Sequence, residues 1–565
     1  QKSNPKQLAK KLTHDIQTLE VFQSHQKDIQ IALEPIKGNL SNIEYMLAIV
    51  GIFILLVTWI NFINLAGAKA LGRFKEMGVR KVLGSVKSQI IRQFVFEGLL
   101  LNIIGLMCAL GIVFLIFPYL RIFTNNRVLP LNEWQTFINP LFLLVFFIGA
   151  VITSLYPAII LAGLNPIDAL KGKIFQSTHK VGFRKTLVIF QFSISIVLMI
   201  GVFIISDQMR FIQNQDLGID LSRTLIVKTA KDGWNGKVER LKTFKTEVEA
   251  LSTVEGTASS TMTPGGGNGQ DVSVKLEKHN EMLNLHLIGI DANFINQYEL
   301  EVLAGEPFEK DQFWKNKKGI IINKTAAKKL GYTNFDELIS QKIIQSENGG
   351  KVYEILAVID DYHHQSLKED IPPLIFQFNS LRGHISVKLN AINYQDYEKL
   401  VATIKDVEAI WNKTYSDLPF DYYFLDESFN AQYVGDIRFR KIFEVFTTIS
   451  VFIACLGLFG LSLFVSMKRK KEVGIRKTYG ASSVNILGLF TKDYLIQIFV
   501  AILIGTPVAY FFMEKWLENY SFKTAIHGTS LFIPIVLLVL ISLSCVAFQT
   551  VKAAFANPIK TLKNE

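Results

Sequence analysis

The chain has 565 residues, of which 49% are hydrophobic, and its formal net charge is +11. The positive mean hydropathy and the long charge-free apolar runs exclude an ordinary soluble enzyme and indicate an integral membrane protein. All three cysteines, Cys108, Cys455 and Cys545, fall within these runs, so we expect no disulfide scaffold in the polar part of the chain.

Several apolar runs reach the roughly 20 residues needed to cross about 30 Å of hydrocarbon as a helix. We predict seven transmembrane helices, at residues 45–66, 98–120, 141–164, 186–206, 445–467, 494–513 and 531–551. The loops rich in Lys and Arg follow the first, third and fifth of these helices. Because such loops stay in the cytoplasm, we expect a multi-pass protein of the plasma (inner) membrane. Residues 1–44 and 207–440 would then be extracytoplasmic and the C-terminus cytoplasmic.

The polar segment 1–44 has no secretory signal before it, although it is expected to lie outside the membrane. Something upstream must carry it across. The second triplet of helices follows a membrane helix and a long outward domain, whereas the first follows only this segment. This symmetry predicts a parent protein with eight spans, from which one helix and most of a first outward domain are missing here.

One charged motif occurs twice, each time between the first two helices of a triplet. Six of the eleven positions in residues 75–85 and 471–481 are identical, namely Lys, Glu, Gly, Arg, Lys and Gly. The triplets also end alike, in Asn165-Pro166 and Asn557-Pro558, where the chain leaves the bilayer. A repeat in the same membrane context indicates an internal duplication.

Membrane topology and anionic lipid would account for the basic charge of the motif. They do not account for the fixed order Lys-Glu-x-Gly-x-Arg-Lys or for a second glycine six residues after the first. The apolar members form no single helical stripe, which favours insertion into the cleft of a partner. We predict that these residues dock a partner: Lys75, Glu76, Met77, Gly78, Val79, Arg80, Lys81 and Gly84, and Lys471, Glu472, Val473, Gly474, Ile475, Arg476, Lys477 and Gly480.

The predicted spans hold no acid or base in their interiors, which argues against a proton-coupled carrier or an ion channel. Glu97 and Asp493 flank the second helix of each triplet. We interpret both as first-turn carboxylates that are favoured by the helix dipole, in preference to a proton relay.

Residues 207–440 are long enough for a domain with its own core. Strand-like runs lie at 224–228, 271–276, 283–290, 319–322, 352–358, 374–378 and 384–389, and helical patterns at 237–251, 324–330 and 394–411. This mixture predicts an α+β fold in two lobes, with 290–370 as the inserted lobe. The segment 439–467 has few helix breakers, so we expect the first helix of the second triplet to extend outward as a stalk.

Two other stretches have residue types that are used in chemistry. The glycine-rich stretch 265–270 lacks the Gly-Lys-Ser/Thr ending of a phosphate loop, so we interpret it as a flexible surface loop. His363 and His364 would point to opposite faces of a strand, which favours packing or exposure over shared metal binding. We find no nucleotide-binding motif, and we expect no cofactor, metal or nucleic-acid partner.

The sequence resembles the FtsX/MacB-type permease family of ABC transporters. The resemblance lies in the motif at 75–84 and 471–480 and in the two Asn-Pro endings. It also covers three stretches of the polar domain that look like a MacB-like periplasmic core, at 290–308, 322–331 and 358–364. The fold class it implies is an α-helical integral membrane protein with an α+β two-lobed extracytoplasmic domain.

The resemblance implies a non-catalytic permease that couples ATP hydrolysis by a separate cytoplasmic ABC ATPase to movement of the outward domain. A periplasmic adaptor or a second permease copy would be compatible partners, besides the lipid bilayer. The implied organisation is an extracytoplasmic remnant (1–44), a first FtsX-like triplet (45–171), a linker with the fourth helix (172–206), the periplasmic core (207–440) and a second triplet (441–565). A membrane sensor whose outward domain binds a ligand is the alternative.

Overall fold

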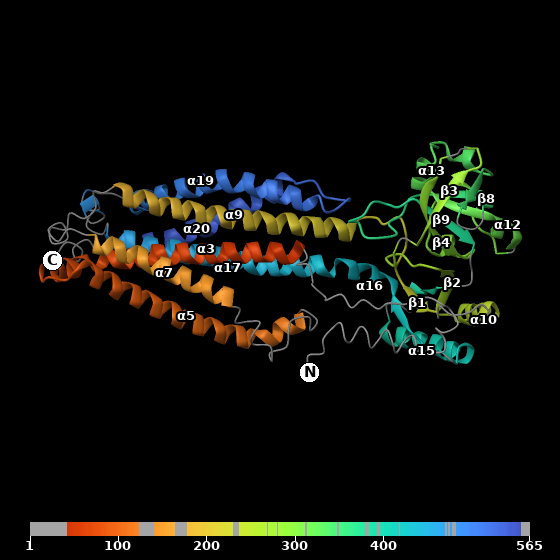
Figure 1. Ribbon diagram of the computed structural model, residues 1–565, viewed down its shortest axis with the longest axis horizontal. Helices are drawn as coiled ribbons and strands as arrows, with labels where there is room; N and C mark the ends of the chain where they lie inside the picture. The colour runs from red at the N-terminus through yellow and green to blue at the C-terminus, as the bar shows by residue number, and fades with distance from the viewer. Residues whose placement is uncertain are drawn as a thin grey trace, which may run out of the picture.

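Long helices form one end of the computed structural model, and a β-rich domain forms the other (Figure 1). The structure describes residues 42–554 except 124–139, 164–177, 230–236, 268, 279–280, 311–312, 347–349, 379–382, 392–395, 417, 469–471, 473–474, 477–478 and 480–481. The predicted outward segment 1–44, apart from the first three residues of a helix, and both Asn-Pro endings lie outside these residues.

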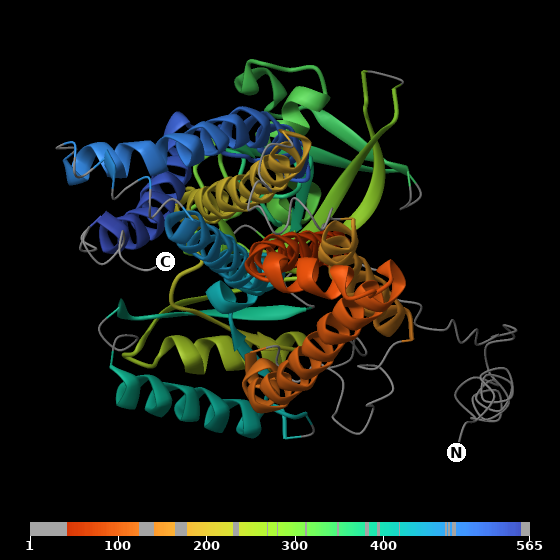
Figure 2. The same ribbon diagram turned by 90° about the vertical axis from the view of Figure 1, so that its left-hand side faces the viewer.

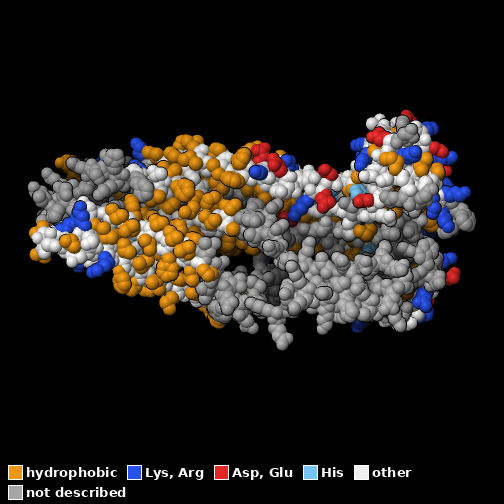
Figure 3. Space-filling model, viewed as in Figure 1, with side chains coloured by type: hydrophobic (Ala, Val, Ile, Leu, Met, Phe, Trp, Pro, Cys, Tyr) orange, Lys and Arg blue, Asp and Glu red, His pale blue; other side chains and the backbone are white. Residues whose placement is uncertain are grey.

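Seven long helices make up the helical end. They are α3 (Asn42–Gly72), α5 (Lys87–Phe123), α7 (Pro140–Ala162), α9 (Thr178–Asn214), α17 (Val434–Lys468), α19 (Ser483–Leu517) and α20 (Gly528–Ala554). Their exposed side chains form a broad apolar band, with Lys and Arg gathered at its outer end (Figure 3). Such a band indicates that these helices lie in a membrane.

The predicted number of seven spans is not confirmed. Among the described residues, six helices are long and apolar enough to cross a membrane, and they correspond to α3, α5, α9, α17, α19 and α20. The predicted third span coincides with α7, whose apolar part is only Leu143–Ile159. The chain is therefore a helical membrane protein that carries a separate β-rich domain.

The helices form two groups that face each other (Figure 2). In one group α3 and α5 both contact α7, and in the other α9, α19 and α20 contact one another. Helix α17 joins them by packing on α3, where a Cβ on Gly457 would lie 2.4 Å from Asn61 Oδ1. Small residues permit such close approach of helices in membranes.

The α9 and α5 spans differ most in burial. In α9, 72% of the apolar window is buried inside the structure, whereas in α5 the share is 0%. Helix α9 thus fills the centre of the second group, and α5 lies at the edge of the first.

Six strands of the β-rich domain close on themselves. In order around the ring they are β4 (Leu283–Ile290), β3 (Gln270–Leu276), β7 (Lys342–Gln345), β8 (Lys351–Ile359), β6 (Gly319–Asn323) and β9 (Leu374–Phe378), which pairs in parallel with β4. A short strand, β5 (Val302–Gly305), pairs with β8. Buried side chains such as Val274, Ile322 and Ile355 form the core of this lobe.

Four short helical segments connect the strands of this barrel-like lobe. They are α11 (Phe294–Gln297), α12 (Phe313–Lys318), α13 (Lys324–Lys329) and the 3-10 turn η1 (Phe335–Leu338). The sequence explains the β6-to-α13 step. Three successive isoleucines suit a fully buried strand. Asn323 then caps α13 by accepting a hydrogen bond from Ala326 N.

The second lobe has four strands and two packed helices. Its elements are β11 (Tyr422–Phe424), β1 (Thr224–Lys228), β10 (His384–Leu389), β2 (Val254–Ser260), α10 (Lys237–Glu249) and α15 (Tyr397–Thr414). Phe244 and Trp411 pack edge to face in its core, with ring centroids 5.3 Å apart. The short helix α16 (Leu425–Asn430) and the turn η3 (Ala431–Tyr433) lead from this lobe into α17.

The two lobes share one sheet but are joined weakly, because β2 and β4 pair only at Ser260 and Ile290. The predicted boundaries of the inserted lobe, 290–370, are wrong. Strands β3 and β9 belong to this lobe, so it extends from Gln270 to Phe378. The hydrophobic pattern places strands well, but it cannot tell which strands pair.

Candidate functional site

The first copy of the repeated motif forms helix α4 (Phe74–Val82), which connects α3 to α5 at the outer end of the helices. Its Met77 is buried against Ile90 of α5 and Leu161 and Ala162 of α7. Met77 therefore holds α4 on its own chain, and the expectation that it enters a partner is wrong. Gly84 ends the turn with φ of +95°, a conformation that favours glycine.

Lys81 also anchors α4. Its Nζ donates a hydrogen bond to the carbonyl of Ala162, in the last turn of α7, at 2.6 Å. A cation is favourable at this position because the carbonyl end of a helix is negative. Burial, followed by the nearby charge of Lys87, lowers the pKa of Lys81.

The opposite side of α4 is open. Val79 is nearly half-exposed, Val82 is more exposed, and Leu83 is 80% exposed. Glu76 and Arg80 lie beside these residues and form an ion pair of 2.7 Å one helical turn apart. The open side thus combines exposed apolar side chains with a fixed pair of opposite charges.

The second copy repeats this arrangement in the residues that the structure describes. Glu472 and Arg476 pair at 2.9 Å, as Glu76 and Arg80 do. Ile475 is exposed like Val79, and Tyr479 is 88% exposed at the position equivalent to Leu83. The backbone also matches, because Tyr479 N donates to Ile475 O at 3.2 Å and Leu83 N to Val79 O at 3.0 Å.

The exposed residues that the structure describes in the two copies therefore form two similar surfaces. We call Val79, Leu83 and the Glu76–Arg80 pair the first docking face, and Ile475, Tyr479 and the Glu472–Arg476 pair the second. Gly78 is buried. The side chain of Lys75 and the residues Lys471, Val473, Gly474, Lys477 and Gly480 lie outside what the structure describes.

Leu83 and Tyr479 were absent from the predicted docking residues, although two other non-identical pairs, Met77/Val473 and Val79/Ile475, were among them. Leucine and tyrosine differ, but both are large apolar residues 396 positions apart. The matching position was the signal that could have identified them.

The expectation that Glu97 and Asp493 lie in first helical turns is wrong. Helix α5 begins at Lys87 and α19 at Ser483, so each carboxylate lies about three turns into its helix. Glu97 Oε2 pairs at 2.8 Å with Arg73, which lies between α3 and α4, and Asp493 Oδ1 pairs with Lys185 of α9 at 3.3 Å. Both carboxylates therefore link neighbouring helices.

The second candidate site is the junction between the helices and the β-rich domain. The loop after β8 contacts the loop between α19 and α20 through backbone hydrogen bonds. Phe522 N donates to Leu367 O at 3.1 Å, and Ser521 N donates to Lys368 O at 3.2 Å. This pairing joins the domain to the second helix group.

A charged cluster reinforces the junction. Lys368 Nζ pairs with Asp436 Oδ2 at 2.7 Å, and Tyr520 donates a hydrogen bond to Asp436 Oδ1 at 3.0 Å. Asp436 lies at the start of α17, where a carboxylate is favoured by the helix dipole. Burial, followed by the charge of Asp436, raises the pKa of Tyr520 above its ordinary value. We call Lys368, Asp436 and Tyr520 the junction triad.

Both histidines of the predicted pair contribute to packing at this junction. His363 packs edge to face on Phe522, with centroids 4.4 Å apart, and His364 Nδ1 lies 3.0 Å from the hydroxyl of Tyr362. Burial lowers the pKa of His364 to about 4. Among the described residues, no group of three or more metal-binding side chains forms a site.

The glycine-rich stretch lies at the surface as expected, with Gly266 exposed, but its described residues form a hydrogen-bonded turn. Gly265 N donates to the carbonyl of His364 at 2.7 Å. Gly265, Gly267 and Gly269 all have positive φ, and a Cβ on Gly269 would lie 2.5 Å from Leu287 O. These glycines are needed for a tight turn, which the sequence could not distinguish from an open loop.

A family model described as "FtsX-like permease C-terminal" matches residues 48–166 and again residues 444–558. Among curated relatives, the macrolide export ATP-binding/permease protein MacB of Chromobacterium violaceum is 20% identical over 307 residues, which are 53% of this chain and 47% of the relative. The uncharacterized ABC transporter permease YknZ of Bacillus subtilis is 23% identical over 247 residues, which are 42% of this chain and 59% of the relative.

A solved structure, the periplasmic region of MacB from Actinobacillus actinomycetemcomitans, covers 38% of this chain and 94% of its own at 13% identity and a TM-score of 0.27. The chain spans about half the length of the curated relatives it matches. The two matches to the family model fall on the two helix groups, and each contains one copy of the motif. Each helix group thus contains an FtsX-like permease domain, and the chain as a whole resembles the FtsX/MacB-type permeases of ABC transporters.

Proposed function

We propose that this chain is the membrane subunit of an ABC system and couples ATP hydrolysis on other subunits to movement of its β-rich domain. It is not itself a catalyst in this proposal. The observation that carries it is the pair of docking faces, which repeat one ion pair and one exposed apolar position at equivalent places. Two such faces fit two similar partner subunits.

The helices provide the path for coupling. With 35 residues, α17 is about 52 Å long at 1.5 Å per residue, more than the hydrocarbon thickness. It leads from the second docking face to the junction triad, where Lys368 and Tyr520 meet Asp436. Movement of a docking face would therefore reach the domain through a rigid helix and a bonded joint.

The orientation belongs to this proposal. The docking faces lie among the basic loops, which favours the cytoplasm, and the β-rich domain would be extracytoplasmic. The MacB relatives are named ATP-binding/permease proteins. We infer that the corresponding ATP-binding function is supplied here outside the 565 residues, because they contain no nucleotide-binding motif.

Affinity purification of the full-length protein from its own membranes tests this proposal. We expect an ATPase with a phosphate-binding loop to co-purify with the wild type. The double variant Leu83→Asp/Tyr479→Asp should lose it, because burying an unpaired carboxylate in an apolar contact costs several kcal/mol. Neither side chain is packed in the fold, so membrane insertion should be unchanged.

Tyr397→Asp is the matched control, since Tyr397 is similarly exposed but lies on α15 of the β-rich domain. This variant should retain the ATPase. Capture of a cytoplasmic protein without a nucleotide-binding site would contradict the proposal. So would equal recovery of the ATPase with the double variant.

A further inference from the structure

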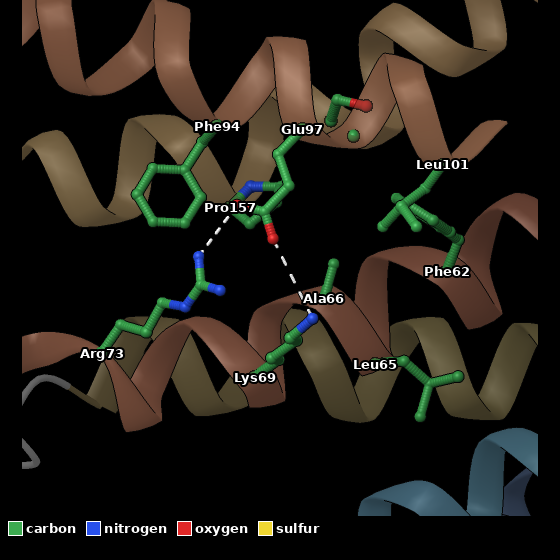
Figure 4. A pocket seen from close by; sticks show the side chains of 11 residues that line it. Phe62, Leu65, Ala66, Lys69, Arg73, Phe94, Glu97, Leu101 and Pro157 are labelled. Atoms are coloured by element: carbon green, nitrogen blue, oxygen red, sulfur yellow. Dashed lines mark hydrogen bonds and ion pairs between the residues drawn. The ribbon is translucent and has the colours of Figure 1, made fainter. Parts of the chain in front are cut away.

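A cavity of about 250 Å³ opens between α3, α5 and α7, close to the docking end of the helices (Figure 4). Its wall is apolar on one side, with Phe62 and Leu65 from α3 and Leu101 from α5. Its other end is polar, where Lys69 of α3 and Arg73, just after that helix, face Glu97 of α5 (Figure 4). The cavity is therefore amphipathic along its length.

The polar end lies at the membrane boundary. The apolar span of α3 ends at Gly67, so Lys69 and Arg73 are the next cations beyond it. This is the level of the lipid headgroups, and the apolar walls at Phe62 and Leu65 are at the level of the acyl chains.

The equivalent space in the second helix group is filled by α9. Leu461 and Gln497, which correspond to Leu65 and Leu101, are only 5% and 6% exposed, and α9 packs on both of their helices, α17 and α19. Leu65 and Leu101 are 38% and 48% exposed. Gly460 of α17 packs against part of the Leu65 side chain, and in the described part of the chain both leucines keep an exposed face.

The charges of the two places also differ. In the second group the incoming helix supplies Lys185 to pair with Asp493. In the first group Glu97 is already paired, at 2.8 Å with Arg73 and at 3.9 Å with Lys69, both at the end of α3 where it joins α4. Position 465, which corresponds to Lys69, is a valine. The cavity thus has one cation in excess and suits an anionic occupant, whereas another lysine-bearing helix would be repelled.

We propose that this cavity binds one anionic phospholipid. Its phosphate would lie between Lys69 and Arg73, and an acyl chain would cover Leu65 and Leu101. A phosphodiester with one negative charge matches the single excess positive charge, and Arg binds phosphate oxygens through paired N–H donors. The lipid would take the place that α9 occupies in the other group.

Photo-cross-linking tests this site directly. A benzoylphenylalanine in place of Leu101 is illuminated in the full chain, reconstituted in vesicles of seven parts dioleoylphosphatidylcholine to three parts dioleoylphosphatidylglycerol. Mass spectrometry then identifies the adduct. We expect lipid adducts, with phosphatidylglycerol enriched about tenfold over its share of the vesicle, as about 1.4 kcal/mol of preference would give.

Charge variants separate recognition from folding. Lys69→Gln/Arg73→Gln should abolish the enrichment, and Glu97→Gln should increase it, because the latter adds to the net positive charge. If the substitutions merely unfolded the protein, the enrichment would fall in both variants. Arg92→Gln, on the same helix as Glu97 but outside the cavity, should leave the enrichment unchanged.

Three results would overturn the proposal. A cross-link to a polypeptide would show that a protein segment covers the cavity. Adducts in the proportions of the vesicle would show that no headgroup is recognised. If Arg92→Gln lost as much enrichment as Lys69→Gln/Arg73→Gln, the enrichment would come from a general attraction between basic residues and anionic lipid.

Discussion

Residues of one motif serve two separate tasks in this protein. Met77 and Lys81 face inward and fasten α4 to α5 and α7, whereas Leu83 and the Glu76–Arg80 pair face outward. The sequence could identify the motif because it is repeated. It could not assign the tasks, because the direction of each side chain depends on where α7 ends.

Glu97 illustrates a second limit of sequence reasoning. The charge-free run starts only after this residue, which made Glu97 look like the beginning of a helix. In the structure α5 begins ten residues before Glu97, at Lys87, and these first turns carry charged side chains. Hydropathy thus marks where the hydrocarbon begins and not where the helix does.

The junction triad predicts an effect on stability. Lys368→Met leaves Asp436, which is buried, without its cation, so we expect a loss of about 1–2 kcal/mol, given that Lys368 is partly exposed. The thermal unfolding midpoint in detergent should fall by a few degrees. Lys413→Met removes an exposed pair with Glu247 and should change the midpoint by less than about one degree. Equal midpoints for both variants would show that the triad is not a significant joint.

His364 predicts a pH dependence. Its pKa falls from 6.5 in the unfolded chain to about 4 in the folded protein, so between these values the unfolded state binds more protons. Stability should therefore fall as the pH is lowered from 6.5 to 4, with a contribution on the order of 3 kcal/mol from this residue. His364→Gln should remove that contribution.

The measurement is the thermal unfolding midpoint of the full chain at pH 6.5 and pH 4, followed by tryptophan fluorescence. The difference between the two midpoints should shrink in His364→Gln and stay as in the wild type in His527→Gln, because His527 is exposed. An unchanged pH difference in His364→Gln would mean that His364 is protonated at low cost.

At the scale of whole elements, burial pattern decides what the sequence can predict. Strands β1, β4, β9 and β10 begin and end at the predicted residues, because each is a short run of apolar and β-branched side chains. Strand β2 (Val254–Ser260) was missed. After Val254 its sequence, VEGTASS, has only small and polar side chains, and the strand is held in place by pairing with β10.

Helix packing in the first group predicts the effect of a glycine substitution. A Cβ on Gly149 of α7 would lie 2.0 Å from the indole ring of Trp59 on α3, so Gly149→Val must displace that ring or force the two helices apart. We expect a loss of about 1–3 kcal/mol, as in other overpacked cores. The unfolding midpoint in detergent measures it.

Gly111→Val is the control for that measurement. Gly111 lies on α5, and nothing is within 4 Å of the position of a Cβ there. It should unfold close to the wild type. If the two variants unfold alike, α3 and α7 do not pack as closely as the structure indicates.

At the scale of the whole molecule, the two groups of helices are similar but not equivalent. The duplication was visible in the sequence as matched motifs, and the same spacing relates the docking faces in the structure. The sequence could not show that α9 packs mainly within the second group. The packing of α9 depends on which helices contact each other in the folded chain. The joint between the lobes likewise depends on which strands pair, here β2 and β4 at Ser260 and Ile290.

Native mass spectrometry of the purified complex tests the central claim, that each docking face binds one ATPase subunit. We predict two ATPase subunits for each copy of this chain in the wild type. Leu83→Asp or Tyr479→Asp alone should leave one, and the two together none. Retention of both subunits by the double variant, or loss of both from a single one, would contradict two separate and similar docking faces.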